Sequence, residues 1–399
     1  MPTRRAFLKQ VAIATTLRNI SVADAVPASV GHLSLAGGAR RIPHTDLMIS
    51  RFGCACSGLV AWDRAPLSAA DIATASHLVH AACDSGITLF DHADPYAFGK
   101  AEAVFGEVLK QSPDLRDRLV IQSKCGQRFA DGWKPGDPIH ADLSREHIVS
   151  SAEGTLQRLA TDRLDILLLH VADTLAQPEE IAAAFDHLHQ SGKVCYFGVT
   201  DYNAAQIQLL QKTLRQPLVV NQFQLGLAHP YPLIDGMEFT LQLAKGNGGA
   251  DLYASTTVAG TFDYCRTHSV QIQGTSPLDI TLDPSPGSEP EYTQTARLLT
   301  EIARDKATTP SAIALAWLLR HPAGIIPLLD SVSPKSLIAS FEATQVSLSH
   351  DEWYLLFAAA SRLQSLQWED VSPADKSTFY GAIDCTGCAF RPKGQYLPR

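Results

Sequence analysis

Four residues with reactive side chains follow one another along the chain, at or just after places where short apolar runs end. They are Asp91, Tyr96, Lys124 and His170. Runs such as 119–124 and 164–170 have the length and apolar content of a strand buried in a parallel sheet. Because the carboxyl ends of parallel strands meet at one rim of a barrel, we expect these four side chains to lie close together.

A tyrosine beside a lysine suits the reduction of a carbonyl group. A free phenol has a pKa of ~10, too high for an efficient acid at neutral pH. A neighbouring ammonium group favours the tyrosinate, so we expect Lys124 to lower the pKa of Tyr96. Asp91 would pair with Lys124 and hold it in place. His170 would orient the carbonyl oxygen or share in the proton transfer.

Each of these residues also has a purely structural interpretation. Taken singly, His170 is more often a satisfied core histidine, and Tyr96 a packing residue. Asp91 and Lys124 could form an incidental ion pair. Their joint occurrence at strand ends favours a catalytic role over these separate explanations.

Strands and helices alternate from residue 45 to residue 360. The expected strands are one near 49–56 and seven that end at Asp91, Lys124, His170, Val199, Gln222, Gly274 and Leu328. Eight strands separated by helices predict one α/β domain with the fold of a (β/α)₈ TIM barrel.

Three further segments do not belong to the bare barrel. A long insertion precedes strand seven, between Gln222 and Gln271, and we expect one or two helices in it, such as 232–245. Residues 127–142 are expected to form a loop. A polar C-terminal tail occupies 361–399. The insertion and the tail could shape the substrate entrance or could be surface additions without a role in the site. The sequence does not decide between these two interpretations.

From about Ser50 to Trp353 the chain resembles the aldo-keto reductase superfamily, whose catalytic tetrad is Asp, Tyr, Lys and His in this order. The resemblance implies that the enzyme uses NADPH to reduce an aldehyde or ketone, or oxidises the alcohol. Its partner would be a small carbonyl substrate, which the sequence does not identify. The alternative is a catalytically inactive barrel of this type that acts as a binding or regulatory protein.

The resemblance also assigns residues to the nicotinamide end of the cofactor. Thr200, Asp201 and Gln222 stand at positions that hold the carboxamide group in the family. Asp201 replaces an amide, and an ionised carboxylate cannot donate a hydrogen bond.

The next family motif is an aromatic residue followed by Ser-Pro-Leu. In this chain the motif assigns Ser276 and Leu278 to the cofactor site. Thr275 replaces the ring that stacks on the nicotinamide. Loss of that stacking should weaken binding by ~1 kcal/mol or more.

At the phosphate end the resemblance assigns Ser331 and Lys335. There a helix N-terminus and basic side chains normally hold the cofactor phosphates. Asp330 replaces a glycine and adds a negative charge near an anion. NADP is therefore implied by the family rather than by these residues, and NAD is the alternative.

The composition limits the other classes of partner. The 399 residues carry a net charge of −8, which argues against nucleic acid as the main partner. No apolar run approaches the length of a membrane span. Cys54 and Cys56 could join Cys385 and Cys388 in a zinc site. A buried strand cysteine and a tail disulfide are the simpler interpretation, so no metal is expected.

The first 40 residues are expected to be a leader or extension outside the barrel. Arg4 and Arg5 resemble a twin-arginine export signal, with a small-residue cleavage site at 23–25. Such a signal would place the protein in the periplasm. Arg18 interrupts the apolar stretch, and the alternative is a disordered extension on a cytoplasmic enzyme.

Overall fold

A closed barrel of eight parallel strands forms the centre of the protein. The computed structural model describes residues 38–129, 139–234, 237–243, 250–256, 260–279, 290–330 and 333–360. The barrel strands are β3 (Gly53–Ala55), β4 (Leu89–Asp91), β5 (Val120–Cys125), β8 (Leu164–Leu169), β9 (Val194–Thr200), β10 (Leu218–Gln224), β13 (Gln271–Thr275) and β14 (Ile326–Leu329). Each pairs with the next in chain order, and β14 closes onto β3. The predicted (β/α)₈ fold is confirmed.

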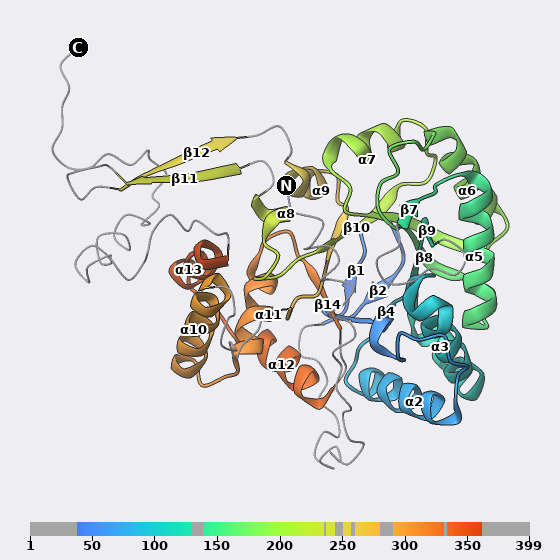
Figure 1. Ribbon diagram of the computed structural model, residues 1–399, viewed down its shortest axis with the longest axis horizontal. Coiled ribbons are helices and arrows are strands. Elements are labelled where there is room, and N and C mark those ends of the chain that lie inside the picture. Colours follow the sequence, from blue (N-terminus) through green and yellow to red (C-terminus); the bar gives the residue numbers. More distant parts are fainter. Residues whose placement is uncertain are drawn as a thin grey trace.

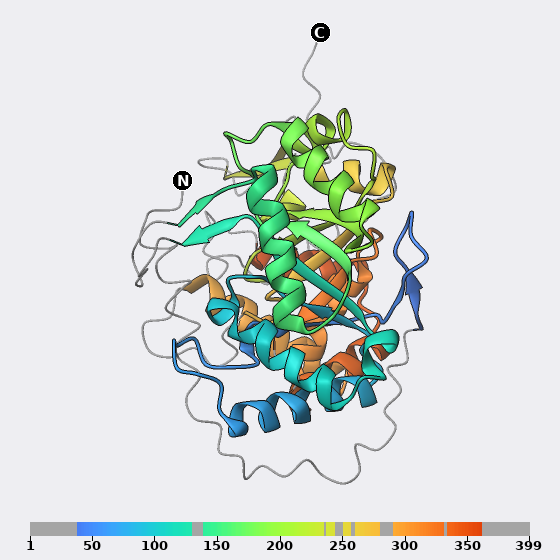
Figure 2. The ribbon, with the colours of Figure 1, turned by 90° about the vertical axis from the view of Figure 1, so that its right-hand side faces the viewer.

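Helices cover the outside of this barrel, as Figures 1 and 2 show. Several begin at a polar cap: Ser144, for example, accepts a hydrogen bond from the backbone N–H of His147. The helices are α2 (Ala69–Asp84), α3 (Lys100–Gln111), α4 (Leu115–Arg118), α5 (Arg145–Leu159), α6 (Pro178–Gln190), α7 (Ala204–Gln211), α8 (Tyr231–Ile234), α9 (Thr261–Thr267), α10 (Pro290–Asp305), α11 (Pro310–Arg320), α12 (Pro334–Gln345) and α13 (His350–Ala360). Within the described residues, no helix is long and apolar enough to cross a membrane.

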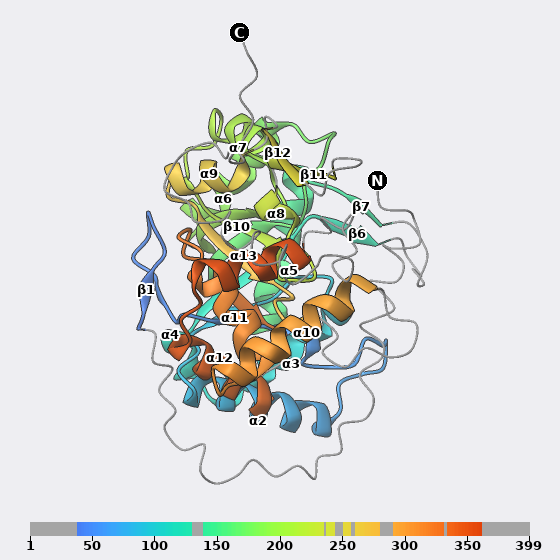
Figure 3. The ribbon, with the colours of Figure 1, turned by 90° about the vertical axis from the view of Figure 1, so that its left-hand side faces the viewer.

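The amino-terminal end of the barrel is closed by an antiparallel hairpin, β1 (Arg40–Arg41) and β2 (Met48–Ile49). Ile42 and Ile49 are fully buried there. They belong to one apolar cluster with the inward-facing side chains of the barrel strands, among them Leu89, Ile166 and Leu328. In Figure 3, β1 lies on the opposite side of the molecule from β6 and β7, the strands that follow the carboxyl end of β5.

Three local expectations need correction. The predicted helix over 232–245 is wrong, because α8 ends at Ile234 and β11 (Met237–Leu243) then pairs with β12 (Ala250–Thr256) as an antiparallel hairpin. Apolar and polar residues alternate strictly along β11, which is the period of a strand. This hairpin projects away from the barrel in Figure 1.

Two predicted boundaries also differ from the structure. The strand expected near 49–56 is split, since β2 belongs to the closing hairpin and only β3 joins the barrel. The expected loop at 127–142 begins and ends in paired strands, β6 (Gln127–Phe129) and β7 (Ile139–Ala141). The expected tail at 361–399 and most of the expected leader lie outside the described residues.

Candidate active site

A buried ion pair links two neighbouring barrel strands. Asp91 ends β4, and Lys124 lies near the end of β5. The Nζ of Lys124 donates to Oδ2 of Asp91 at 2.5 Å and to the carbonyl oxygen of His92 at 2.9 Å. The exposed fractions of the two side chains are 1% and 0%. Charges removed from water to this degree persist only when they are paired, so the two residues act as one unit.

Tyr96 lies beside this pair, in the loop that follows β4. The Nζ of Lys124 is 5.0 Å from the centre of the tyrosine ring. The backbone then makes a left-handed turn, with φ of 49° at Ala97, 60° at Phe98 and 85° at Gly99. An L-residue in this region costs roughly 1–2 kcal/mol. The rest of the fold must therefore hold this turn, and Tyr96 with it, in one position.

Contacts from the β3–α2 loop help to hold the turn. The guanidinium carbon of Arg64 lies 4.2 Å from the centre of the Phe98 ring. Lys100, the first residue after the turn, forms an ion pair with Asp63. The indole of Trp62 packs against Tyr96, with ring centres 6.1 Å apart. These contacts place aromatic side chains beside the ring of Tyr96.

His170 follows β8 and faces Tyr96 edge to face, with ring centres 6.4 Å apart and an interplanar angle of 89°. Burial and the charge of Lys124 lower the pKa of His170 to about 3, so its ring is neutral at physiological pH. Its Nδ1 is buried and has no hydrogen-bond partner among the described residues. Nε2 is the ring nitrogen left for a ligand.

The prediction of a lowered tyrosine pKa is wrong for the ligand-free site. Burial raises the pKa of Tyr96 to about 12, and Lys124 opposes that rise without cancelling it. For Lys124, burial acts to lower the pKa, but Asp91 and Tyr96 together raise it above its ordinary value. The site therefore holds a neutral phenol beside a charged ammonium group.

Two glutamines bind the second oxygen of Asp91 and a third bonds to both of them, and Gln122 and Gln273 among these were not predicted. Gln122 and Gln222 both donate from Nε2 to Oδ1 of Asp91, at 2.6 and 3.1 Å. Gln273 accepts from both of them, at 2.9 and 3.0 Å, and its own Nε2 donates to Oε1 of Gln122 at 3.0 Å. Since β5 and β13 are not neighbours in the sheet, these bonds cross the inside of the barrel. A pattern of inward-facing glutamines at the level of Asp91 could have revealed the cluster.

The predicted nicotinamide residues lie at the same end of the barrel. Thr200 is buried, and its Oγ1 accepts a hydrogen bond from the backbone N–H of Val171 at 2.9 Å. Asp201 follows with a φ of 57° and is exposed to solvent. The surrounding protein nevertheless raises its pKa to about 6. Thr200 and Gln222 thus lie on the neighbouring strands β9 and β10, and Asp201 directly follows Thr200.

The other predicted cofactor residues are less fully described. Ser276 has a φ of 51°, and Leu278 packs partly against the core. Lys335 lies in the first turn of α12, and Ser331 lies outside the described residues. Asp330 follows β14 at this end, where burial and nearby Asp279 raise its pKa to about 7.

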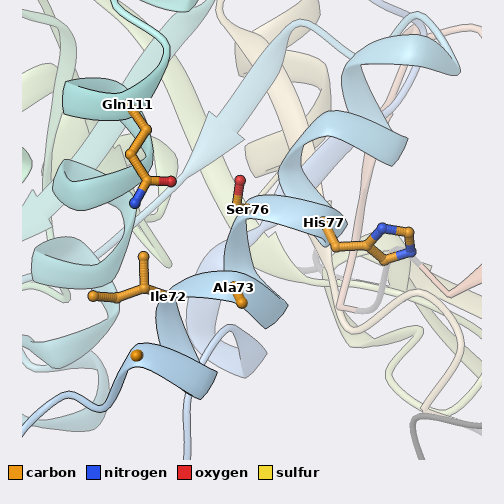
Figure 4. A pocket seen from close by; sticks show the side chains of 6 residues that line it. Ile72, Ala73, Ser76, His77 and Gln111 are labelled. Carbon is orange, nitrogen blue, oxygen red and sulfur yellow. The ribbon is translucent and has the colours of Figure 1, made fainter.

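Within the described residues, the remaining sequence candidates do not come together as a second site. Cys54 and Cys56 are buried and free, while Cys385 and Cys388 lie outside the described residues. In the part of the chain that the structure describes, no three metal-binding side chains come together. A groove of about 520 Å³ lies on the outer surface between α2 and α3. Figure 4 shows that Gln111 points into it while His77 points away from it.

Comparisons with known proteins agree with this geometry. Residues 56–360 match the sequence model of the aldo/keto reductase family. The oxidoreductase YdhF of Escherichia coli is 34% identical over 285 residues, which span 69% of this chain and 84% of that protein. The 6-dehydroglucose reductase of Agrobacterium fabrum is 31% identical over 285 residues, 71% of this chain and 86% of that protein. The solved structure of the glycerol dehydrogenase from Gluconobacter oxydans covers 85% of this chain and 98% of its own, with a TM-score of 0.65 at 20% identity. That likeness concerns the fold alone.

Proposed function

The chain belongs to the aldo/keto reductase family, and we propose that it is a nicotinamide-dependent oxidoreductase that reduces an aldehyde or ketone with Tyr96 as the proton donor. The observation that carries this proposal is the chain of contacts from Asp91 through Lys124 to Tyr96, with His170 beside it. NADPH is the proposed cofactor, and NADH is the alternative.

The residues at the nicotinamide end fit such a cofactor. Both N–H groups of the Gln222 side chain are used inside the barrel, by Asp91 and Gln273. The Oε1 atom of Gln222 accepts no hydrogen bond from a described residue. A buried atom of that kind would lack any partner, and Gln222 Oε1 does not belong to the buried atoms in that condition. It therefore touches solvent and is free to accept from a carboxamide. Thr200 accepts a bond through Oγ1 and so retains its hydroxyl proton for a ligand.

We assign one role in the reaction to each side chain of the site. When bound, the nicotinamide supplies the hydride. Because its pKa is about 12, Tyr96 keeps its proton until the carbonyl oxygen gains negative charge and takes it. The ammonium group of Lys124 then stabilises the phenolate left behind. Asp91 holds that ammonium in place, and neutral His170 offers Nε2 to orient the oxygen.

Spectrophotometry tests the proposed activity. The purified protein is mixed with NADPH and a panel of carbonyl compounds, and the decrease of nicotinamide absorbance is followed. Oxidised sugars come first in the panel, because one relative is a 6-dehydroglucose reductase. Turnover of at least one aldehyde or ketone is expected. Failure across the panel, together with absence of nucleotide binding, would favour the inactive binding barrel.

Cofactor binding should be weak, because Thr275 offers no ring to a nicotinamide. Discrimination between NADPH and NADH should be poor, because Asp330 places a carboxylate where the family holds the phosphates. The side chain of Thr275 donates to the carbonyl oxygen of Phe223 instead. We expect Thr275→Trp to tighten binding of NADPH and NADH by about fivefold, which corresponds to ~1 kcal/mol of stacking. Fluorescence titration of both nucleotides measures this, with Thr275→Val as the control without a ring. Tight, strongly NADPH-selective binding by the unmodified protein would contradict this alignment of β13.

For the leader, we separately propose export by the twin-arginine route. Changing Arg4→Lys and Arg5→Lys together is expected to retain the precursor in the cytoplasm, because this route depends on the arginine pair. Fractionation of the native host, with mass spectrometry of the amino terminus, checks it. A protein that keeps residues 1–25 in the host would indicate a cytoplasmic enzyme.

A further inference from the structure

The hydrogen bonds among Gln122, Gln222 and Gln273 have only one consistent direction. An amide side chain can be turned end for end, and its orientation has to be deduced from its neighbours. The carboxylate of Asp91 only accepts hydrogen bonds. Gln122 and Gln222 must therefore turn their NH₂ groups towards Oδ1 of Asp91, as the distances of 2.6 and 3.1 Å require.

This choice fixes the third amide as well. The second N–H of Gln122 and that of Gln222 both point at Gln273, which must present its carbonyl oxygen to them. The NH₂ of Gln273 then faces Oε1 of Gln122 and completes a reciprocal amide pair. The exposed fractions of Gln122 and Gln273 are both 0%, so water does not offer alternative partners. The charge of Asp91 thus sets the orientation of every amide in the cluster.

The last consequence concerns the atom that reaches solvent. With both of its N–H groups engaged, Gln222 can offer only its carbonyl oxygen to a ligand. We propose that Gln122 and Gln273 are positioning residues, which lock Gln222 as an acceptor for the cofactor carboxamide and hold Asp91 in place against Lys124. This inference rests on the proposed function, because it assigns a purpose to the same site.

The Gln273→Glu variant tests the proposal, because a carboxyl group can mimic the amide only while it is protonated. A neutral acid accepts from Gln122 and Gln222 and donates its O–H to Oε1 of Gln122. Once ionised, it repels Asp91 and leaves that oxygen of Gln122 without a donor. NADPH affinity and kcat should therefore stay near wild type at acidic pH and fall together as pH rises. The expected loss is about tenfold to a hundredfold, the range for a hydrogen bond to a charged group.

Gln271→Glu is the matched control on the same strand. Gln271 is also buried and donates two hydrogen bonds, to the carbonyl oxygens of Ile272 and Gly324, but it has no contact with Asp91. Its variant should lose stability as pH rises, as followed by urea unfolding. Its NADPH dissociation constant and its pH profile of kcat should match those of the wild type while it remains folded.

The outcomes separate the two proposals. Asp201 and Asp330 titrate near neutrality in every variant, so each affinity is compared with that of the wild type at the same pH. The positioning role alone would be overturned if the wild type turns over a carbonyl substrate and the ratio of NADPH affinities between Gln273→Glu and wild type stays constant from about pH 6 to about pH 8, one unit on either side of neutrality. A pH-dependent loss of affinity of the same size in Gln271→Glu would also overturn it. If the wild type binds no nucleotide at any pH, the proposed function fails first.

Discussion

Replacing Tyr96 with Phe is expected to lower kcat by a factor of about 10² to 10⁴, the usual contribution of a general acid. The substitution removes one oxygen and leaves the ring against Trp62 and Lys124, so packing is preserved. Besides Tyr96, the ammonium group of Lys124 contacts the carboxylate of Asp91 and the carbonyl oxygen of His92, and neither of these can replace the phenol as a proton donor. Steady-state kinetics with any good carbonyl substrate measures the effect.

Two measurements distinguish loss of the proton donor from loss of cofactor binding or of structure. NADPH affinity should remain near wild type in Tyr96→Phe, because the hydroxyl acts on the reacting oxygen. Tyr264→Phe is the matched control, since Tyr264 lies on α9 and stacks on His268 with ring centres 4.0 Å apart. It should turn over at the wild-type rate. Near-wild-type turnover by Tyr96→Phe would remove Tyr96 from the mechanism.

Lys124→Met is expected to lower both stability and turnover. The substitution leaves the carboxylate of Asp91 buried without its cation, and breaking a buried pair in this way typically costs about 3–5 kcal/mol. Methionine fills a similar volume, so the loss is electrostatic rather than a cavity effect. Urea unfolding measures the change in the free energy of unfolding, and kinetics measures the loss of phenolate stabilisation.

The double variant Lys124→Met with Asp91→Leu separates these two effects. Removing both charges should recover part of the lost stability, because no ion then remains unpaired in the barrel. Recovery should be incomplete, since Gln122 and Gln222 lose the acceptor that they share. Turnover should not recover at all. A single Lys124→Met variant within about 1 kcal/mol of wild type would mean that water screens the pair.

The barrel could be predicted from the sequence because its strands are short, mostly apolar runs that alternate with helices along the chain. The same reasoning placed Asp91 and Lys124 together, since β4 and β5 are successive strands of one sheet. The insertion was harder: α8 does form near the predicted start, but the alternation along β11 outweighed the length expected of a helix. In this segment the alternation of apolar and polar residues indicates the element type, and the length of the insertion does not.

The interior of the site was only partly predictable. Gln122 and Gln273 each look like a single polar residue in a buried strand, and nothing local shows that they meet. Their contact depends on closure of the barrel, which brings β5 and β13 face to face across its interior. The pKa of Tyr96 was misjudged for a related reason. The effect of one neighbouring charge can be inferred from sequence, whereas the cost of burial depends on the whole fold.

The hairpin β1–β2 has a consequence for the order in which ligands bind. Ile42 and Ile49 fill the amino-terminal end of the barrel, so the proposed cofactor and carbonyl substrate would have to reach Lys124 through the opposite end. In the proposed reaction the two ligands would share one entrance, so we expect that they do not exchange independently. Initial-rate kinetics should therefore show a compulsory order, with oxidised nucleotide competing against NADPH and the alcohol product not competing with it.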